Sequence, residues 1–200
     1  MSGSEILTLL SGRFIDFRIR PFTYKEIQEI DSATSVTDYL IWGGFPGRFQ
    51  TSNSDAQREY LQDIENTIVY NDLIKRYKIR KEVDFKKIVN FILMSNSRII
   101  SARNIQRYLS NECESISLNT VLKYLEYLKE AYIVDEIPYY SNKAKRELSY
   151  HYKLYDSDVA FNSLSVSNNR FDLDHNLENV IYNELIYRGY SLKVFDNNGK

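Results

Sequence analysis

The 200-residue sequence has little cysteine, proline or glycine, and it has no long apolar run. Its one cysteine, Cys113, excludes an internal disulfide and fits a reducing compartment. No apolar run approaches the ~18 residues that a membrane-spanning helix needs, and the N-terminus lacks the basic-then-apolar layout of a secretory signal. We therefore expect a cytoplasmic protein that makes no membrane contact.

An excess of either charge sign is also missing, because 26 basic and 27 acidic residues give a formal net charge of −1. The sequence thus lacks the overall basic charge that usually marks a nucleic-acid binder. Hydrophobic residues make up 43% of the chain and charged residues 26%, which is the composition of a globular protein with its own core. Any nucleic-acid contact is therefore expected to be local and weak.

The motifs of common catalytic centres are missing as well. His151 and His175 are isolated, and Cys113 has no partner at a metal-ligand spacing. The glycine-rich stretch at 43–47 is not followed by lysine and Ser/Thr in the register of a phosphate-binding loop, so we interpret it as a tight structural turn. No Gly-x-Ser-x-Gly elbow is present. The sequence predicts no metal site, no cofactor and no complete catalytic site in this chain.

The stretch 101–156 carries the clearest structural pattern. Ser101 and Ser117 each precede a helical pattern, and the polar turn 111–115 separates the two helices. Apolar residues recur at helical spacing in both: Ile105, Tyr108 and Leu109 in the first, and Leu118, Val121, Leu122, Leu125 and Leu128 in the second. A further apolar helix at 85–93 precedes them.

Strand-like runs follow at 133–140 and 148–155, with the polar segment 141–145 as the tip of a hairpin. Helix, turn, helix and a two-stranded wing is the order of a winged helix-turn-helix. The sequence therefore predicts this module at the centre of the chain, with the helix at 85–93 as its first helix.

The N-terminal part predicts a strand and two short helices. Residues 14–20 alternate between apolar and charged side chains, which predicts a half-buried strand with Phe17 and Ile19 on the inner face. A capping box at 23–26 opens a short helix that carries Ile27 and Ile30 inward. Another short helix is expected at 34–42.

A longer helix is expected from residue 54 to about residue 78. Its apolar face comprises Tyr60, Leu61, Ile64, Ile68 and Leu73. Its end is basic, with Lys75, Arg76, Lys78, Arg80 and Lys81 in close succession. Two interpretations stay open for these cations: a solvated helix end that the helix dipole favours, or a patch that contacts phosphates.

The C-terminal part predicts a short helix at 159–164 and a longer amphipathic helix closed by Gly189. A strand is expected at 191–195. The apolar stripe of the longer helix consists of Leu177, Val180, Ile181, Leu185 and Ile186. We expect this stripe to be buried, either against the winged helix or against a second copy of the chain.

Nucleic-acid binding by the central module can be weighed by counting charges. Between residues 98 and 156 there are nine basic and eight acidic side chains, a net charge of about +1. The candidate nucleic-acid contacts are Arg103, Arg107, Lys123, Lys143, Lys145 and Arg146. Specific binders make about 6–10 phosphate contacts, more than this module supplies. Weak DNA contact and packing against a protein partner both remain open.

Ordered motifs over nearly the whole chain resemble a known family. They are SGR at 11–13, PFTYKE at 21–26, YLIWGGFPG at 39–47, YLQDIENTIVYNDLIKRYKIR at 60–80, SLNTVLKYLEYLKEAYIV at 117–134, KLYDSD at 153–158 and LENVIYNELIYRGYSLKV at 177–194. This order resembles the predicted AAA+-type P-loop ATPases of bacteria and archaea that carry a C-terminal domain of unknown function.

The resemblance implies that the chain is a middle piece, preceded in the parent by an ATPase core that binds ATP and Mg²⁺. Ser4 lies in a segment similar to the end of the family's sensor strand, and Arg13 matches its Gly-Arg. Both residues are therefore nucleotide-sensing candidates, with Arg13 as a finger on the γ-phosphate. A surface arginine ahead of a strand is the alternative.

The resemblance also bears on the C-terminal part, since 177–190 is similar to the first helix of a PD-(D/E)xK nuclease-like domain. Glu178 and Glu184 are candidate accessory carboxylates there, while the carboxylates that would hold the catalytic Mg²⁺ lie beyond Lys200.

Together these inferences predict a mainly helical α+β chain. The expected parts are the end of an ATPase core with a lid-like region at 1–50, a linker helix at 51–81, the winged helix at 82–157, and the truncated start of a nuclease-like domain at 158–200. The expected function is that of a non-catalytic fragment of an ATP-dependent regulator, with weak DNA or partner binding. The alternative is a protein-interaction or oligomerisation module that relays nucleotide state, and a homo-oligomer is expected in either case.

Overall fold

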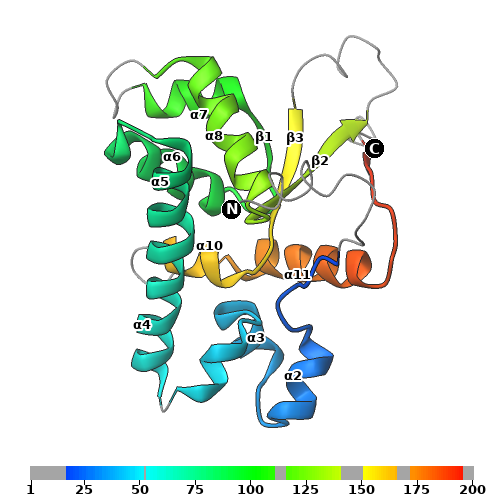
Figure 1. Cartoon of the computed structure of the whole chain (residues 1–200). Helices are drawn as coiled ribbons and strands as arrows, with labels where there is room; N and C mark the ends of the chain where they lie inside the picture. The colour runs from blue at the N-terminus through cyan, green and yellow to red at the C-terminus, as the bar shows by residue number, and fades with distance from the viewer. Residues whose placement is uncertain (1–16, 52, 111–115, 141–150, 166–171, 196–200) are drawn as a thin grey trace.

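The computed structural model describes residues 17–51, 53–110, 116–140, 151–165 and 172–195. Within them the chain is a mostly helical α+β protein with one small sheet, as expected. In Figure 1 the sheet lies at the top, helix α11 (Leu173–Tyr187) crosses beneath it, and helices α2 (Tyr24–Ile30) and α3 (Val36–Trp42) lie at the bottom.

A long helical rod joins the two ends of the molecule in Figure 1. It consists of α4 (Ser54–Ile64), the π-helical segment η2 (Glu65–Asp72) and α5 (Leu73–Tyr77). The expected helix is thus present, but the predicted inward position of Ile68 is wrong, because Ile68 is exposed and Val69 and Tyr70 are buried instead. A π turn holds more residues than an α turn, so it rotates the inward face by one position.

The centre of the chain runs in the order α6 (Glu82–Met94), β1 (Ile99–Ser101), α7 (Ala102–Leu109), α8 (Leu118–Glu130), β2 (Val134–Tyr140) and β3 (His151–Asp156). Ser101 and Ser117 cap α7 and α8, since their hydroxyls accept the backbone N–H groups of Asn104 and Thr120. The apolar helix predicted at 85–93 is confirmed as α6. Its side chains Phe85, Ile88, Val89, Ile92 and Leu93 are all fully buried and pack with Ile105, Val121 and Leu125 in the main core.

The sheet has the strand order β1-β3-β2-β4, in which the first three strands are antiparallel. Ile100 pairs with Tyr152 at one edge, and Ile137 pairs with Lys153 in the middle. The short strand β4 (Val194–Phe195) runs parallel to β2 and falls within the strand expected at 191–195. The turn at 111–115 and the hairpin tip at 141–145 lie outside the described residues.

The strand predicted at 14–20 is wrong for its described part, residues 17–20, which form no strand. Phe17 and Ile19, expected inside, are exposed, with 93% of Ile19 accessible. The charged side chains face inward instead: Arg18 and Arg20 bind the two carboxylate oxygens of Asp135 at 2.7 and 2.9 Å. Burial raises the pKa of Asp135, but the two guanidinium groups outweigh it and hold the pKa below its ordinary value.

Two helices place one apolar residue differently from the sequence prediction. The capping box at Thr23 and Glu26 is confirmed and Ile27 is fully buried, but Ile30 is exposed. Helix α2 is only seven residues long, so a single apolar position suffices to anchor it. Tyr108 on α7 is also exposed, with its ring lying 4.6 Å from that of Phe91.

Helix α11 is present, but the predicted burial of its apolar stripe is wrong for Leu177 and Ile181, which are exposed. The fully buried positions are Asn176 and Asn179, and Tyr182 is nearly so. The buried face is polar because it lies against backbone groups that need hydrogen-bond partners, as described below. The stripe is therefore divided: Leu177 and Ile181 are exposed, whereas Val180, Leu185 and Ile186 are half-buried.

The glycine-rich stretch is a tight turn, as expected, between α3 and the 3₁₀ helix η1 (Pro46–Gln50). Gly43 adopts a φ of 68°, and a side chain at this position would meet the carboxylate of Asp158 within 1.6 Å. Gly44 accepts the backbone N–H of Phe22 at 2.9 Å, and a Cβ on it would lie 2.1 Å from the Phe22 carbonyl oxygen. The turn therefore brings three separate backbone segments together.

Substitution of Gly43 by alanine should unfold the chain more readily than the matched change at Gly189. Both glycines have positive φ, but a Cβ on Gly189 meets nothing within 4 Å. Gly189→Ala should thus cost about 1–2 kcal/mol of left-handed strain. Gly43 has a ψ of −160°, a backbone region essentially restricted to glycine, so Gly43→Ala should cost about 1–3 kcal/mol of strain and a further overpacking cost of about 1–3 kcal/mol. Urea denaturation measures both, and equal losses would show that the Gly43–Asp158 approach is not tight.

Candidate functional site

A buried junction at the end of β3 joins the glycine turn, the segment that follows β3 and helix α11. The carboxylate of Asp158, which is almost fully buried, accepts the backbone N–H of Gly44 at 2.7 Å and that of Ala160, the first residue of α10 (Ala160–Ser165), at 2.8 Å. Burial raises the pKa of Asp158 to about 6, although the two N–H donors oppose that rise. The side chain thus ties the glycine turn to the start of α10.

Asp156 lies two residues earlier and is fully buried. Within the described part of the chain its two carboxylate oxygens have no hydrogen-bond partner. Burial raises its pKa well above the ordinary value, and the charges of Asp158 and Glu65 raise it further. The folded environment of Asp156 therefore favours the protonated form of its carboxyl group.

The inner face of α11 supplies the amides that satisfy this junction. Asn179 accepts the backbone N–H of Asp156 at 2.7 Å and donates to the carbonyl of the same residue at 2.8 Å. Asn176 donates to the Leu40 carbonyl at 2.8 Å, and Asn183 donates to the Asp156 carbonyl at 3.1 Å. These bonds fix α11 against both the sheet and α3.

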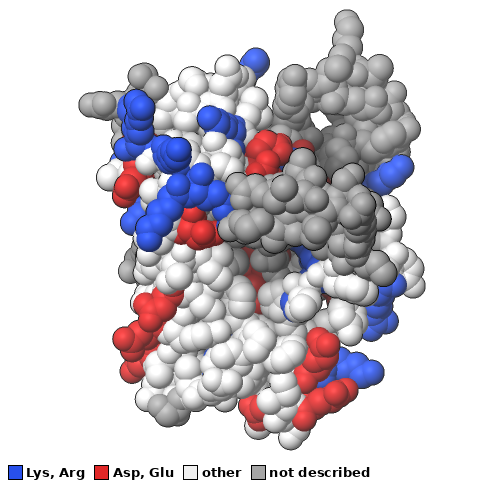
Figure 2. Space-filling view, viewed as in Figure 1, with Lys and Arg blue, Asp and Glu red and all other residues white. Residues whose placement is uncertain are grey.

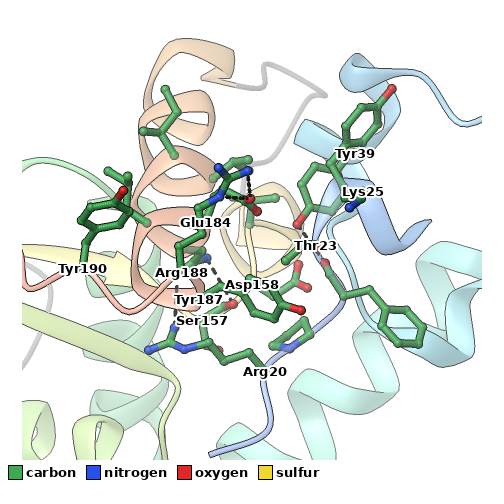
Figure 3. A pocket seen from close by; sticks show the side chains of 18 residues that line it. Arg20, Thr23, Lys25, Tyr39, Ser157, Asp158, Glu184, Tyr187, Arg188 and Tyr190 are labelled. Atoms are coloured by element: carbon green, nitrogen blue, oxygen red, sulfur yellow. Dashed lines mark hydrogen bonds and ion pairs between the residues drawn. The ribbon is translucent and has the colours of Figure 1, made fainter. Parts of the chain in front are cut away.

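A pocket of about 500 Å³ opens beside the junction, between α11 and the segment 20–25. Figure 3 shows Glu184 and Arg188 of α11 on one side and Thr23, Lys25 and Tyr39 on the other. Glu184 and Arg188 form an ion pair at 2.7 Å, and the Tyr39 hydroxyl donates to the Phe22 carbonyl at 2.9 Å. Glu184 and Arg188 therefore neutralise each other beside the pocket.

Exposed apolar and aromatic side chains line the same pocket. Ile181 is 51% exposed, Tyr187 56% and Tyr190 59%, all on or just after α11. The Tyr187 hydroxyl donates to Glu26 at 3.4 Å across the opening. This surface, Ile181 with Tyr187 and Tyr190, is called the α11 patch below. Its chemistry suits a protein surface better than a small charged ligand.

A second, smaller groove of about 290 Å³ lies at the opposite end of the molecule, between the α5–α6 turn and α8. Its charged lining residues are Lys78, Arg80 and Lys123, with no carboxylate among them. Figure 2 shows blue side chains gathered at the upper left, where α5, α6 and α8 lie in Figure 1. The sequence pointed to this basic stretch but left its role open.

Tyrosine stacking fixes the α5–α6 turn to α8. The rings of Tyr77 and Tyr127 lie parallel with centroids 3.4 Å apart, and the Tyr77 hydroxyl donates to Glu130 at 2.5 Å. The pKa of Tyr77 is raised to about 12, mainly because its hydroxyl is buried and also because that hydroxyl donates to Glu130. These contacts join the two segments that line the groove.

The predicted site residues fall in different places. Arg103 and Arg107 are exposed on α7, and Arg107 donates to Asn104 at 3.2 Å. Lys123 is exposed on α8, with its amine 5.8 Å above the Tyr127 ring. The remaining candidates Ser4, Arg13, Lys143, Lys145 and Arg146 lie outside the described residues.

The two candidate accessory carboxylates do not converge. Glu178 forms an ion pair with Lys153 and accepts the Tyr155 hydroxyl at 2.8 Å, so it lies against the sheet, whereas Glu184 lines the pocket. Among the described residues no group of three His, Cys, Asp or Glu side chains is placed to hold a metal ion. In the same part of the chain, no helix has the length and apolar character to cross a membrane.

Comparisons with known proteins identify a family, but they assign no activity to it. A family model described as "Domain of unknown function (DUF8612)" matches residues 33–170. An uncharacterized protein of Haemophilus influenzae is 27% identical over 97% of this chain, and one of Methanocaldococcus jannaschii is 29% identical over 94%. This chain covers 50% and 45% of those two proteins, so it spans about half the length of the curated relatives it matches. No solved structure matches the chain significantly.

The two buried carboxyls predict a pH dependence of stability. Their pKa values are raised above the unfolded value of ~3.9, so their neutral forms favour the folded state. The stability from these groups is complete below about pH 4 and is lost as the pH rises through the folded pKa, which for Asp158 is about 6. The loss of this stability should lower the urea midpoint as the pH rises through this range.

Two matched substitutions separate the two carboxyls. Asp156→Asn removes a buried acid without a partner, so it should raise the urea midpoint at pH 8 and flatten the pH dependence. Asp158→Asn leaves one of two buried N–H groups without an acceptor and should cost about 1–3 kcal/mol at every pH. An Asp156→Asn loss as large as that of Asp158→Asn at pH 8 would contradict this assignment.

Proposed function

We propose that this chain, which belongs to the family of unknown function DUF8612, is the non-catalytic regulatory part of an ATP-dependent protein, and that it contacts DNA weakly through a winged helix. The single observation that carries the proposal is the order of elements from α6 to β3. Three helices and a three-stranded antiparallel sheet, with β1 inserted between the first two helices, support the proposal of a winged helix-turn-helix.

In this proposal α8 is the recognition helix. It follows α7 after a short connection and packs its apolar face into the main core, leaving Asn119, Lys123, Glu126 and Glu130 exposed. The N-terminal residues of a recognition helix approach the bases, and here that half carries Asn119 and Lys123. The two carboxylates lie in the other half, which supports weak rather than tight binding.

The ATP-dependent parent is proposed from the resemblance of the ordered motifs. The relatives are about twice as long as the matched stretch, which leaves room in them for a further domain. In the parent, Arg13 and Ser4 would face ATP and Mg²⁺ held by the ATPase core. The nuclease-like continuation after α11, with Glu178 or Glu184 as accessory carboxylate, stays a prediction.

A second candidate function is a protein-interaction module that relays nucleotide state, and the α11 patch favours it. Three large side chains are each more than half exposed around one pocket, and apolar surface gathered in this way commonly marks an interface. This module would bind a protein partner, or a second copy of the chain, with α11 instead of binding DNA with α8.

The DNA proposal predicts weak, sequence-independent binding. Few cations line the face of α8, so the Kd for a duplex should fall in the non-specific range of about 10⁻⁴–10⁻⁶ M near physiological salt. Fluorescence anisotropy of labelled duplexes of unrelated sequence measures it. Nanomolar, sequence-selective binding, or no binding at low salt, would each contradict the proposal.

The interaction module predicts self-association through the α11 patch. Ile181→Glu should shift the chain toward monomer in light scattering, because it places a charge in the apolar centre of the patch. Val83→Glu, at an exposed apolar position on α6, is the matched control and should leave the mass unchanged. A wild-type chain that is monomeric at all concentrations would remove self-association from this candidate.

A further inference from the structure

We propose that the α5–α6 turn, which lies outside the winged helix, is a second phosphate-binding element beside α8, with Lys78 and Arg80 as its contacts. The inference rests on the proposed function and extends it to one occupant, the backbone of duplex DNA. It resolves the two interpretations left open for the basic stretch in favour of a phosphate-contacting patch.

The first observation is the charge of the groove. Its lining comes from two segments: the turn supplies Lys78 and Arg80, and α8 supplies Asn119, Thr120 and Lys123. Three cations line the groove without a carboxylate, and the described residues provide none of the three with an ion pair. DNA phosphates are the complementary charge, and neutral polar groups beside the cations can accept or donate to the same backbone.

The second observation is the place of the groove along α8. It runs along α8 from Asn119 to Tyr127, and its non-aromatic polar residues on that helix, Asn119, Thr120 and Lys123, all lie in the first half. That half enters the groove of DNA in helix-turn-helix proteins. In the second half, Glu126 pairs with Lys129 at 2.8 Å and Glu130 accepts the Tyr77 hydroxyl. The cations without an ion pair therefore lie beside the N-terminal half of α8, which is the half expected to contact DNA.

The third observation is the rigidity of the turn. Ile79 is buried between Lys78 and Arg80, and its N–H donates to the Ile74 carbonyl at 3.0 Å. Tyr77 stacks on Tyr127 of α8, as described above. The two cations are thus exposed on either side of a buried anchor, and the backbone that carries them is fixed against α8 before binding, so only the two side chains have to be ordered.

The fourth observation is the backbone of Lys78 itself. Lys78 ends α5 in the left-handed region, with a φ of 50°. Glycine is the favoured residue at such a helix end, because a side chain there is strained. A lysine at this position costs stability in the free chain, and a phosphate contact gives that side chain a role that the fold alone does not.

A salt series with single variants tests the proposal on the 200-residue chain. The probe is a fluorescein-labelled DNA duplex of two helical turns, and the slope of log K against log salt is measured between about 50 and 200 mM. Three contacts give a slope of about −2.7, equal to about a 40-fold loss of affinity over that range. Lys78→Gly, Arg80→Ala and Lys123→Ala should each reduce the slope by about one.

Two comparisons separate a phosphate contact from a structural effect. Lys78→Gly should also raise the urea midpoint, because it relieves the left-handed strain while weakening DNA binding. Lys25→Ala, which removes an exposed cation at the opposite end of the molecule, should leave the slope unchanged. A slope lowered equally by Lys25→Ala would show that only net charge matters and would overturn the proposal.

The result also tells this inference apart from the proposed function. If Lys123→Ala lowers the slope while Lys78→Gly and Arg80→Ala do not, the winged helix contacts DNA and the α5–α6 turn does not, so the inference alone fails. If the wild-type chain shows no salt-dependent binding, the proposed DNA contact fails, and the inference fails with it.

Discussion

The carboxylate of Asp158 is the contact on which the arrangement of the chain depends. By accepting N–H groups from Gly44 and Ala160, it joins the N-terminal turn to the element that follows the sheet. Two residues earlier, Asn179 satisfies both backbone groups of Asp156 and attaches α11 to the same point. Buried polar groups cost free energy unless they are paired, so these bonds specify one arrangement of the helices rather than merely adding attraction. Both aspartates of this junction lie in the KLYDSD motif at 153–158.

Because its inner face is occupied by asparagines, α11 exposes Leu177 and Ile181, two of the five apolar residues that the sequence pattern assigned to the core. The same inversion occurs at residues 17–20, where Arg18 and Arg20 face Asp135 and the apolar side chains face outward. In both places hydrogen bonds or ion pairs with specific partners decide which side chains face inward, and the spacing of the apolar residues does not. The α11 patch is the exposed surface that results on that helix. The basic groove beside α8 is formed by other elements, lies at a different end of the molecule and suits a different partner.

Local rules predicted much of the fold. Capping residues fixed the starts of α2, α7 and α8, and apolar spacing identified the five core positions of α6. The π-helical register in η2 was not predictable, since it follows from packing rather than from a sequence signal. Neither was the polar inner face of α11, whose partners lie far away in the sequence. Of the site, the basic stretch was visible, but its stacking on α8 through Tyr77 and Tyr127 required the structure.

The central claim is that the surface formed by α8 and the α5–α6 turn, and not the α11 patch, meets the partner. Titration of the ¹⁵N-labelled chain with duplex DNA, followed by amide chemical shifts, tests it most directly. The account predicts shifts concentrated at 78–80 and 119–123, with little change at 181–190. Shifts concentrated at 181–190, or spread evenly over the chain, would contradict it.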